Sequence, residues 1–365
     1  MEQDNAPQRS VGPGRIQLAQ ERREFLRRTL VLGGATVATL RAGAQDLSRN
    51  LPPNVPEWQT TLGAPILEHP YGLPSRHEAN VKRRESPGLT RTPQSSVSFT
   101  PLQNLFGIIT PSSLHFERHH GGMPEVDPHQ HRLMIHGMVA NPRIFTVDDV
   151  MRFPSVSRIH FIECGANTGM EWGNVAVPTV QYTHGMIACS EWTGVLLSTL
   201  LDECGYDRQR ARFVLAEGAD AASLTRSVPI GQYTWIQEAK SVITSPSGGQ
   251  VILDRGYHEI TGLAWTGRGR VRRVDVSTDG GRNWRNAVLQ EPILPKALTR
   301  FRLDWDWEGG PALLQSRVID ETGYVQPTYR QLREVRGTRS IYHNNAIQTW
   351  RVAASGEVSN VQVAS

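Results

Sequence analysis

The chain has 365 residues, of which 38% are hydrophobic and 20% charged, and its formal net charge is +4 at pH 7. This length predicts about two domains, and the apolar runs are all too short to span a membrane. Arginines outnumber acids by three in residues 1–44, so the rest of the chain is nearly neutral. The sequence also has no dense run of basic residues that would indicate nucleic-acid binding. Three cysteines, none in a paired or haem-attachment motif, exclude a disulfide framework and a covalent haem.

Residues 1–44 have the organisation of a twin-arginine signal peptide. The pair Arg22–Arg23 precedes a weakly apolar run from Thr29 to Leu40, and Ala42–Ala44 supplies a small-x-small cleavage site. An amphipathic N-terminal helix is the alternative. We therefore expect the protein to be exported folded and to be periplasmic.

Residues 45–100 are rich in proline and polar residues and have few periodic runs. This composition predicts an extended N-terminal segment that lies over the next domain or reaches a partner, not a module of its own. The basic run Lys82–Arg84 is interpreted as a solvated turn.

Residues 101–237 predict a mixed α+β domain. Residues 131–137 have the pattern of a strand. Thr146 is a suitable N-cap for a short helix over residues 147–151. A second helix is expected from Leu196 to a stop at Gly205. Cys204 near its end, and Cys189 upstream, are interpreted as structural cysteines.

Residues 238–365 change to short strands separated by turns. Residues 270–277 alternate apolar and polar side chains, Asp279–Gly281 supplies a tight turn, and Trp284 opens the return strand. Further strands are expected near residues 301–305 and 316–320. The tryptophans of residues 304–308 are expected to be buried, with the acids between them on the outer face. This spacing favours an immunoglobulin-like sandwich.

The candidate chemical centre is the stretch His160–Trp172. An alternating strand ends at Cys164, and a glycine-containing loop with Asn167 and Thr168 follows. A thiol at a strand end, followed by such a loop, can present its sulfur to a soft metal. A buried structural cysteine beside a turn is the alternative.

The stretch resembles the cysteine loop of the sulfite oxidase family of molybdenum enzymes, with Cys-Gly-Ala-Asn where the family usually has Cys-Ala-Gly-Asn. Residues 181–185, 189–195 and 342–350 narrow the resemblance to the molybdopterin subunit of sulfane dehydrogenases, the SoxC type. It implies a molybdopterin-binding domain of the sulfite oxidase type over residues 101–237, followed by an immunoglobulin-like dimerisation domain over residues 238–365. It also implies one Mo-molybdopterin per chain, with no haem.

By this resemblance Cys164 is the metal ligand and the catalytic residue. The segment His115–His120 resembles the family's phosphate- and pterin-binding stretch, although such a segment alone is typical of a surface loop. Asp220 matches a position that contacts the pterin, with a turn aspartate as the alternative. The implied cofactor-binding residues are Phe116, Arg118, His119, His120, Asn167 and Asp220.

The implied activity is molybdenum-dependent oxidation of sulfane sulfur on the cysteine of a carrier protein, in thiosulfate and sulfur oxidation. Electrons would pass to a c-type, dihaem cytochrome subunit, and the C-terminal domain would form a homodimer. Sulfite dehydrogenation is the alternative within the family. Sulfite oxidases carry an arginine soon after the cysteine loop, where this chain has Thr168 or Gly169. The absence of that arginine, a cation suited to dianionic sulfite, fits a substrate other than free sulfite.

The chain departs from the family after Pro229. Relatives continue there with several dozen residues, including a Gly-x-Pro-x-Arg run and a Val-Lys-Trp-Leu run that contribute to the cofactor site and the substrate pocket. Here the chain passes almost directly to Lys240, and neither run occurs. A third hypothesis is therefore a cofactor-free, inactive relative that acts only as a dimeric partner-binding protein.

Overall fold

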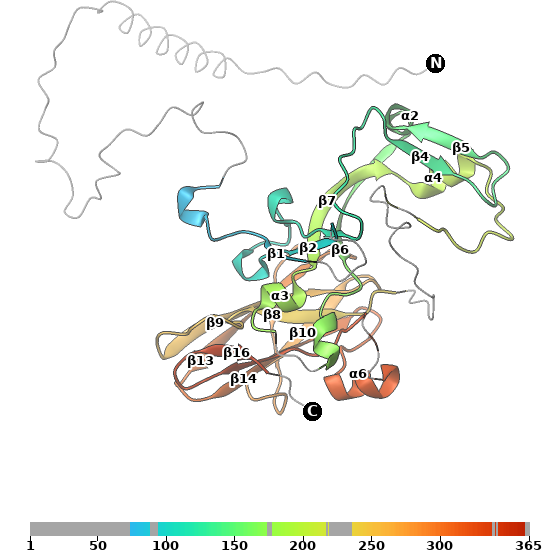
Figure 1. The fold of residues 1–365 in the computed structure, drawn as a ribbon. Helices are drawn as coiled ribbons and strands as arrows, with labels where there is room; N and C mark the ends of the chain where they lie inside the picture. Colours follow the sequence, from blue (N-terminus) through green and yellow to red (C-terminus); the bar gives the residue numbers. More distant parts are fainter. Residues whose placement is uncertain are drawn as a thin grey trace, which may run out of the picture. The chain divides into compact units, whose positions relative to one another are not determined.

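The computed structural model describes residues 74–87, 94–173, 177–216, 218, 236–337, 340 and 342–361. All of these belong to one unit, residues 74–365 (Figure 1). The predicted export signal, the first part of the extended segment, Asp220 and the break after Pro229 lie outside the described residues. No helix in the described ranges is long and apolar enough to cross a membrane.

Residues 84–119 contain a small antiparallel sheet. Strands β1 (Arg84–Pro87), β2 (Ser96–Phe99) and β3 (Arg118–His119) pair in that order. The end of the predicted extended segment is therefore part of a sheet. The interpretation of Lys82–Arg84 as a solvated turn is wrong for two of its residues. Arg83 forms an ion pair with Glu117, and the guanidinium of Arg84 lies 3.8 Å from the centroid of the Tyr182 ring. A cation over an aromatic face is held in place by the ring's charge distribution.

A long antiparallel ribbon carries the cysteine loop. Strand β6 (Ser155–Glu163) pairs with β7 (Ile187–Val195) along its whole length. The far end of this ribbon lies with the β4–β5 hairpin and two helices, which we call the distal lobe. Its elements are β4 (Arg132–Ile135), β5 (Arg143–Thr146), α2 (Val147–Met151) and α4 (Leu197–Glu203). Thr146 caps α2 in a reciprocal capping box with Asp149, as its position predicts.

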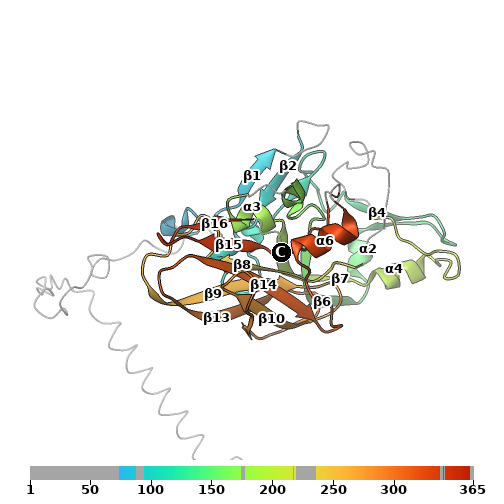
Figure 2. The ribbon, with the colours of Figure 1, turned by 90° about the horizontal axis from the view of Figure 1, so that it is seen from below.

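Residues 240–360 form the predicted β-sandwich, and all of its strand pairs are antiparallel (Figure 2). One sheet has the order β11-β10-β14-β15-β16 and the other β12-β13-β9-β8. The strands are β8 (Lys240–Ser245), β9 (Gly256–Trp265), β10 (Val271–Ser277), β11 (Arg285–Asn286), β12 (Val288–Leu289), β13 (Thr299–Trp307), β14 (Ala312–Asp320), β15 (Thr349–Val352) and β16 (Val358–Asn360). Helix α6 (Tyr329–Arg336) lies between β14 and β15 in sequence. Trp305 and Trp307 are buried and the acids between them exposed, which confirms the predicted alternation.

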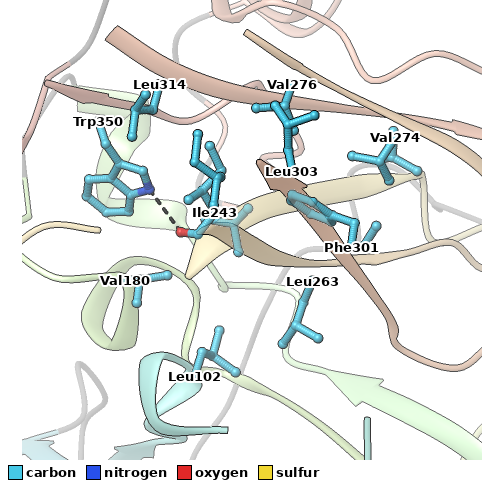
Figure 3. Packing of buried hydrophobic residues seen from close by; sticks show 14 of the residues in the cluster. Leu102, Val180, Ile243, Leu263, Val274, Val276, Phe301, Leu303, Leu314 and Trp350 are labelled. Carbon is cyan, nitrogen blue, oxygen red and sulfur yellow. Dashed lines mark hydrogen bonds between the residues drawn. The ribbon is translucent and has the colours of Figure 1, made fainter. Parts of the chain in front are cut away.

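The largest apolar core joins the sandwich to the first domain. Phe301 and Leu263 from the sandwich belong to the same buried cluster as Leu102 and Val180 (Figure 3). Leu102 lies in η5 (Leu102–Asn104) and Val180 opens α3 (Val180–His184). The indole N–H of Trp350 donates to the carbonyl of Ile243 at 3.0 Å within this core. Burial of a side chain such as Leu102 stabilises the fold by about 1.5–3 kcal/mol, so the two domains are held together by a shared core.

The distal lobe, unlike this shared core, leaves several large apolar side chains exposed to solvent. Its four elements carry five exposed large apolar side chains, Leu133, Met134, Ile144, Met151 and Leu197. Met134 and Ile144 face each other across the β4–β5 hairpin and are both 58% exposed. Contiguous exposed apolar surface is unusual in a monomer and marks an interaction face or a missing cover.

Candidate functional site

Cys164 follows the last residue of β6, where the ribbon gives way to a tight loop. Its backbone N–H donates to the carbonyl of Met186 at 3.0 Å, and its own carbonyl accepts from Asn167 N–H at 2.9 Å. The side chain is half-buried and packs against the cluster that contains Phe116 and Phe99. The thiol is thus held at a strand end and partly shielded from water, and a thiolate there would suit a soft metal.

The residue before Cys164 anchors the loop to the sandwich. Glu163 Oε1 accepts hydrogen bonds from Lys240 Nζ and Asn167 Nδ2, both at 2.9 Å. Its Oε2 accepts from Trp265 Nε1 at 2.7 Å and Gln237 Nε2 at 2.6 Å. The Glu163 and Lys240 side chains are each 2% exposed. A buried carboxylate with four donors is fully satisfied, so it holds the end of β6 in one position.

Thr168 anchors the other end of the loop. Its hydroxyl donates to the carbonyl of Asn344 at 2.6 Å and accepts from Lys240 Nζ at 3.0 Å. Its backbone has φ +63°, which is costly for a β-branched residue and persists only where the surroundings enforce it. Thr168 is one of the two residues, with Gly169, that stand where the resemblance places the arginine of sulfite oxidases, and here it joins the loop to Asn344.

His343 lies against the loop from the second domain. Its backbone N–H donates to the carbonyl of Gly165 at 2.8 Å, and it lines a cavity of about 10 Å³ together with Cys164 and Glu238. Such a cavity has room for about one water molecule. Burial and then the charge of Arg336 lower the pKa of His343, so the imidazole is neutral near pH 7.

His184 lies behind the loop and is buried. Its carbonyl accepts from Asn167 Nδ2 at 3.0 Å, and its Nδ1 lies 2.8 Å from the hydroxyl of Thr183. Burial, and then the charge of Lys240, lower the pKa of His184 well below the usual 6.5. The ring is therefore a neutral packing element of the site and adds no charge to it.

The segment His115–His120 contacts the cluster around Cys164 through Phe116. Phe116 is buried in the same cluster as Cys164. Arg118 and His119 form β3, where Arg118 Nη1 donates to Ser95 Oγ at 3.2 Å and His119 Nε2 lies 2.9 Å from Glu117 Oε2. The structure thus places Arg118 and His119 in the edge of a sheet, and the half-buried His120 directly follows it.

Sequence reasoning missed several residues that define the site. Asn167 was predicted from the loop motif, but its amide hydrogens both bond within the protein, to Glu163 and His184, so it acts by fixing the loop. Lys240 and His343 are 76 and 179 residues from Cys164, and no local pattern links them to it. Only the charge of Glu163 directly before the cysteine could have suggested a buried cationic partner.

The residues around Cys164 fit a metal that is bound mainly by an organic cofactor and needs only one protein ligand. Cys164 is a single thiol, and no cluster of three or more histidine, cysteine, aspartate or glutamate residues occurs in the described ranges. Molybdopterin needs one soft protein ligand plus donors for the phosphate and pterin, because its own dithiolene sulfurs hold the metal. His115 Nε2 is buried and has no hydrogen-bond partner in the described part of the chain, which leaves a polar atom for such a group.

Two family descriptions match the chain. An oxidoreductase molybdopterin binding domain matches residues 120–253, and a Mo-co oxidoreductase dimerisation domain matches residues 232–350. The crystal structure of the sulfane dehydrogenase SoxCD from Paracoccus pantotrophus is similar, with a TM-score of 0.80 and 41% sequence identity. That similarity covers 88% of this chain and 100% of that chain.

More distant relatives extend the similarity. The NADPH nitrate reductase of Phytophthora infestans is 34% identical over 33% of this chain and 14% of its own length. The mitochondrial sulfite oxidase of Mus musculus is 24% identical over 64% of this chain and 60% of its own length. The chain thus spans less than two thirds of the length of these two relatives.

Proposed function

Because the chain belongs to the sulfite oxidase family of molybdenum oxidoreductases, we propose that it is the molybdopterin subunit of a sulfane dehydrogenase. Its substrate would be sulfane sulfur held on the cysteine of a carrier protein. The observation that carries this proposal is the fixed position of Cys164 beside the uncharged Thr168. A site without the arginine of sulfite oxidases favours a substrate with less negative charge than sulfite.

The bound cofactor would supply oxygen-atom transfer to sulfur, with a two-electron change at molybdenum. Cys164 would be the protein ligand, held by the Glu163 network so that its sulfur needs no rearrangement on binding. Phe116 and the apolar cluster beside it would keep water from one side of the thiolate. Of the other implied cofactor contacts, Arg118 and His120 would serve the phosphate, and Asp220 the pterin.

The proposal includes partners and a place of action. Electrons would leave one at a time to a dihaem c-type cytochrome, and the sandwich would form a homodimer through the region that matches the dimerisation domain. The twin-arginine pattern of residues 1–44 supports export of the folded, cofactor-loaded protein to the periplasm.

A cofactor-free relative is the second candidate. Its support is the exposed apolar face of the distal lobe, together with the sequence departure after Pro229. Such a protein would keep the sandwich and its partner surfaces and have no metal. Sulfite dehydrogenation is the alternative within the enzyme class, and analysis of products from sulfite and from a persulfidated carrier distinguishes the two substrates.

The deciding experiment measures molybdenum and pterin in protein purified from a host competent in cofactor synthesis and twin-arginine export. About one metal per chain is expected, lost in Cys164→Ser and retained in Cys204→Ala, which alters a buried cysteine outside the site. A folded wild-type protein without metal would overturn the enzyme proposal and favour the cofactor-free relative.

A further inference from the structure

Residues 342–344 of the second domain contact the cysteine loop and the turn that follows it. His343 N–H donates to Gly165 O, and Thr168 and Asn344 exchange two hydrogen bonds, at 2.6 and 3.4 Å. Trp172 Nε1 also donates to the carbonyl of Tyr342, at 3.2 Å. The loop is thus held along its length by a segment at least 170 residues away in sequence.

Unusual backbone conformations gather at this contact. Three non-glycine residues in the described ranges have positive φ, and two of them, Thr168 and His343, lie here. Thr168 is the more strained of the two, because histidine, here at φ +56°, tolerates this conformation better than a β-branched residue does. Strained residues of this kind persist where the surrounding structure holds them, and they concentrate at functional sites.

The imidazole of His343 covers the residue next to the thiol. A Cβ atom built on Gly165 would lie 3.7 Å from His343 Nε2 and 3.8 Å from its Cε1. His343 also lines the small cavity beside Cys164. Its carbonyl accepts from Arg336 Nη1 at 2.8 Å, and Arg336 forms an ion pair with Glu238 at the same cavity. The backbone of His343 is therefore held from its own domain, and its ring packs across the domain boundary against Gly165.

We propose that His343 is a positioning residue for the metal-ligand loop, and that its imidazole closes the loop from the second domain and shields the Cys164 sulfur. This role rests on the proposed function, in which Cys164 is the metal ligand. By this proposal the dimerisation domain helps to form the site. Residues 343 and 344 hold residues 164–168 in the conformation in which Cys164 would bind the metal. The shielding exists before any cofactor binds, so it can be tested without one.

The test compares His343→Asn with His343→Gln. Asparagine tolerates positive φ and removes the ring, so the backbone is kept and the cover is lost. Glutamine extends a polar group about as far as the imidazole Nε2. His131→Asn is the matched control, because His131 is an exposed histidine in another part of the fold. The first readout is the rate at which iodoacetamide alkylates Cys164 in native, cofactor-free protein, followed by mass spectrometry.

We expect His343→Asn to raise the alkylation rate of Cys164 about tenfold, with His343→Gln near the wild-type rate and the control unchanged. Cys189 and Cys204 are buried, so they stay unmodified unless the whole protein unfolds. An unchanged Cys164 rate in His343→Asn would overturn the proposal, as would equal increases at all three cysteines.

In molybdenum-loaded protein the second readout is the Mo(V) electron paramagnetic resonance spectrum, which is sensitive to the geometry of the cysteine ligand. A shifted spectrum in His343→Asn, with the wild-type spectrum in the control, is expected. An unchanged spectrum in His343→Asn would overturn the positioning role. A wild-type protein that binds no metal would contradict the proposed function. The alkylation rates would still show whether His343 shields the Cys164 sulfur.

Discussion

Glu163 and Lys240 form a buried ion pair at 2.9 Å that joins the residue before the cysteine to the first residue of the sandwich. The same lysine donates to Thr168 Oγ1 at 3.0 Å. One ammonium group therefore connects both ends of the loop to strand β8. The geometry of the candidate metal ligand thus depends on the second domain, and changes at Lys240 should affect stability and the site together.

The first prediction concerns removal of this lysine. Lys240→Met leaves the Glu163 carboxylate buried without its cation, and the expected loss in free energy of unfolding is about 3–5 kcal/mol. Chemical unfolding in urea measures it. Adding Glu163→Gln to Lys240→Met should recover much of the loss, because the uncompensated charge is then removed.

The matched control for that prediction is Arg302→Met. Arg302 pairs with Glu259 across two strands, and both side chains are 36% exposed, so water replaces the partner and the expected loss is below about 1 kcal/mol. Equal losses for the Lys240 and Arg302 variants would contradict the assignment of the Glu163–Lys240 pair as a structural anchor.

Local signals predicted much of the fold. Thr146 as an N-cap predicted the start of α2, and the alternation around Trp305 and Trp307 predicted the inner face of β13. The three-stranded sheet around β2 was not predicted, because its strands are short and its proline-rich surroundings indicate an extended chain. Of the residues predicted for the site, Asn167 lies in the loop that follows Cys164, and Phe116 packs in the same cluster as the thiol. Lys240 and His343 come from distant strands and loops, and their roles depend on the tertiary fold.

The second prediction concerns pH. Burial lowers the pKa of His184 well below 6.5, so the folded protein keeps this ring neutral while the unfolded chain takes up a proton below that pH. Proton uptake by the unfolded state favours unfolding. The free energy of unfolding should therefore fall by up to about 1.4 kcal/mol for each pH unit below 6.5 from this group alone. The lowered pKa of His343 acts in the same direction.

Urea unfolding of the wild type and His184→Gln at pH 7.5, 6.5 and 5.5 measures this effect. The variant should lose less stability on acidification than the wild type, whereas His131→Gln, which alters an exposed histidine, should follow the wild type. Parallel curves for the wild type and His184→Gln would show that His184 does not determine the acid sensitivity.

The third prediction concerns the close approach of the two domains at Gly248. A Cβ atom there would lie 1.9 Å from the carbonyl oxygen of Pro178 and 2.8 Å from the Trp350 ring. Backbone cannot move aside as a flexible side chain does, so Gly248→Ala should cost about 1–3 kcal/mol or more. Gly310→Ala is the control, because nothing lies within 4 Å of its Cβ position. A fall in thermal stability for Gly310→Ala as large as for Gly248→Ala would argue against a steric cause.

The fourth prediction concerns the exposed face of the distal lobe. If Met134 and Ile144 form an uncovered apolar surface, the protein should bind the dye ANS in its native state, and Met134→Lys with Ile144→Glu should reduce that fluorescence. Both side chains are already exposed, so the free energy of unfolding should change by less than about 0.5 kcal/mol. The opposite charges face each other across the hairpin, which limits any effect on strand pairing.

Leu253→Lys is the control for the lobe, because Leu253 is 86% exposed in the sandwich and lies outside this surface. It should leave the dye fluorescence near the wild-type value. Strong destabilisation of the double variant would mean that another part of the chain covers Met134 and Ile144. In that case the lobe would have no uncovered apolar face, and the cofactor-free candidate would lose its structural support.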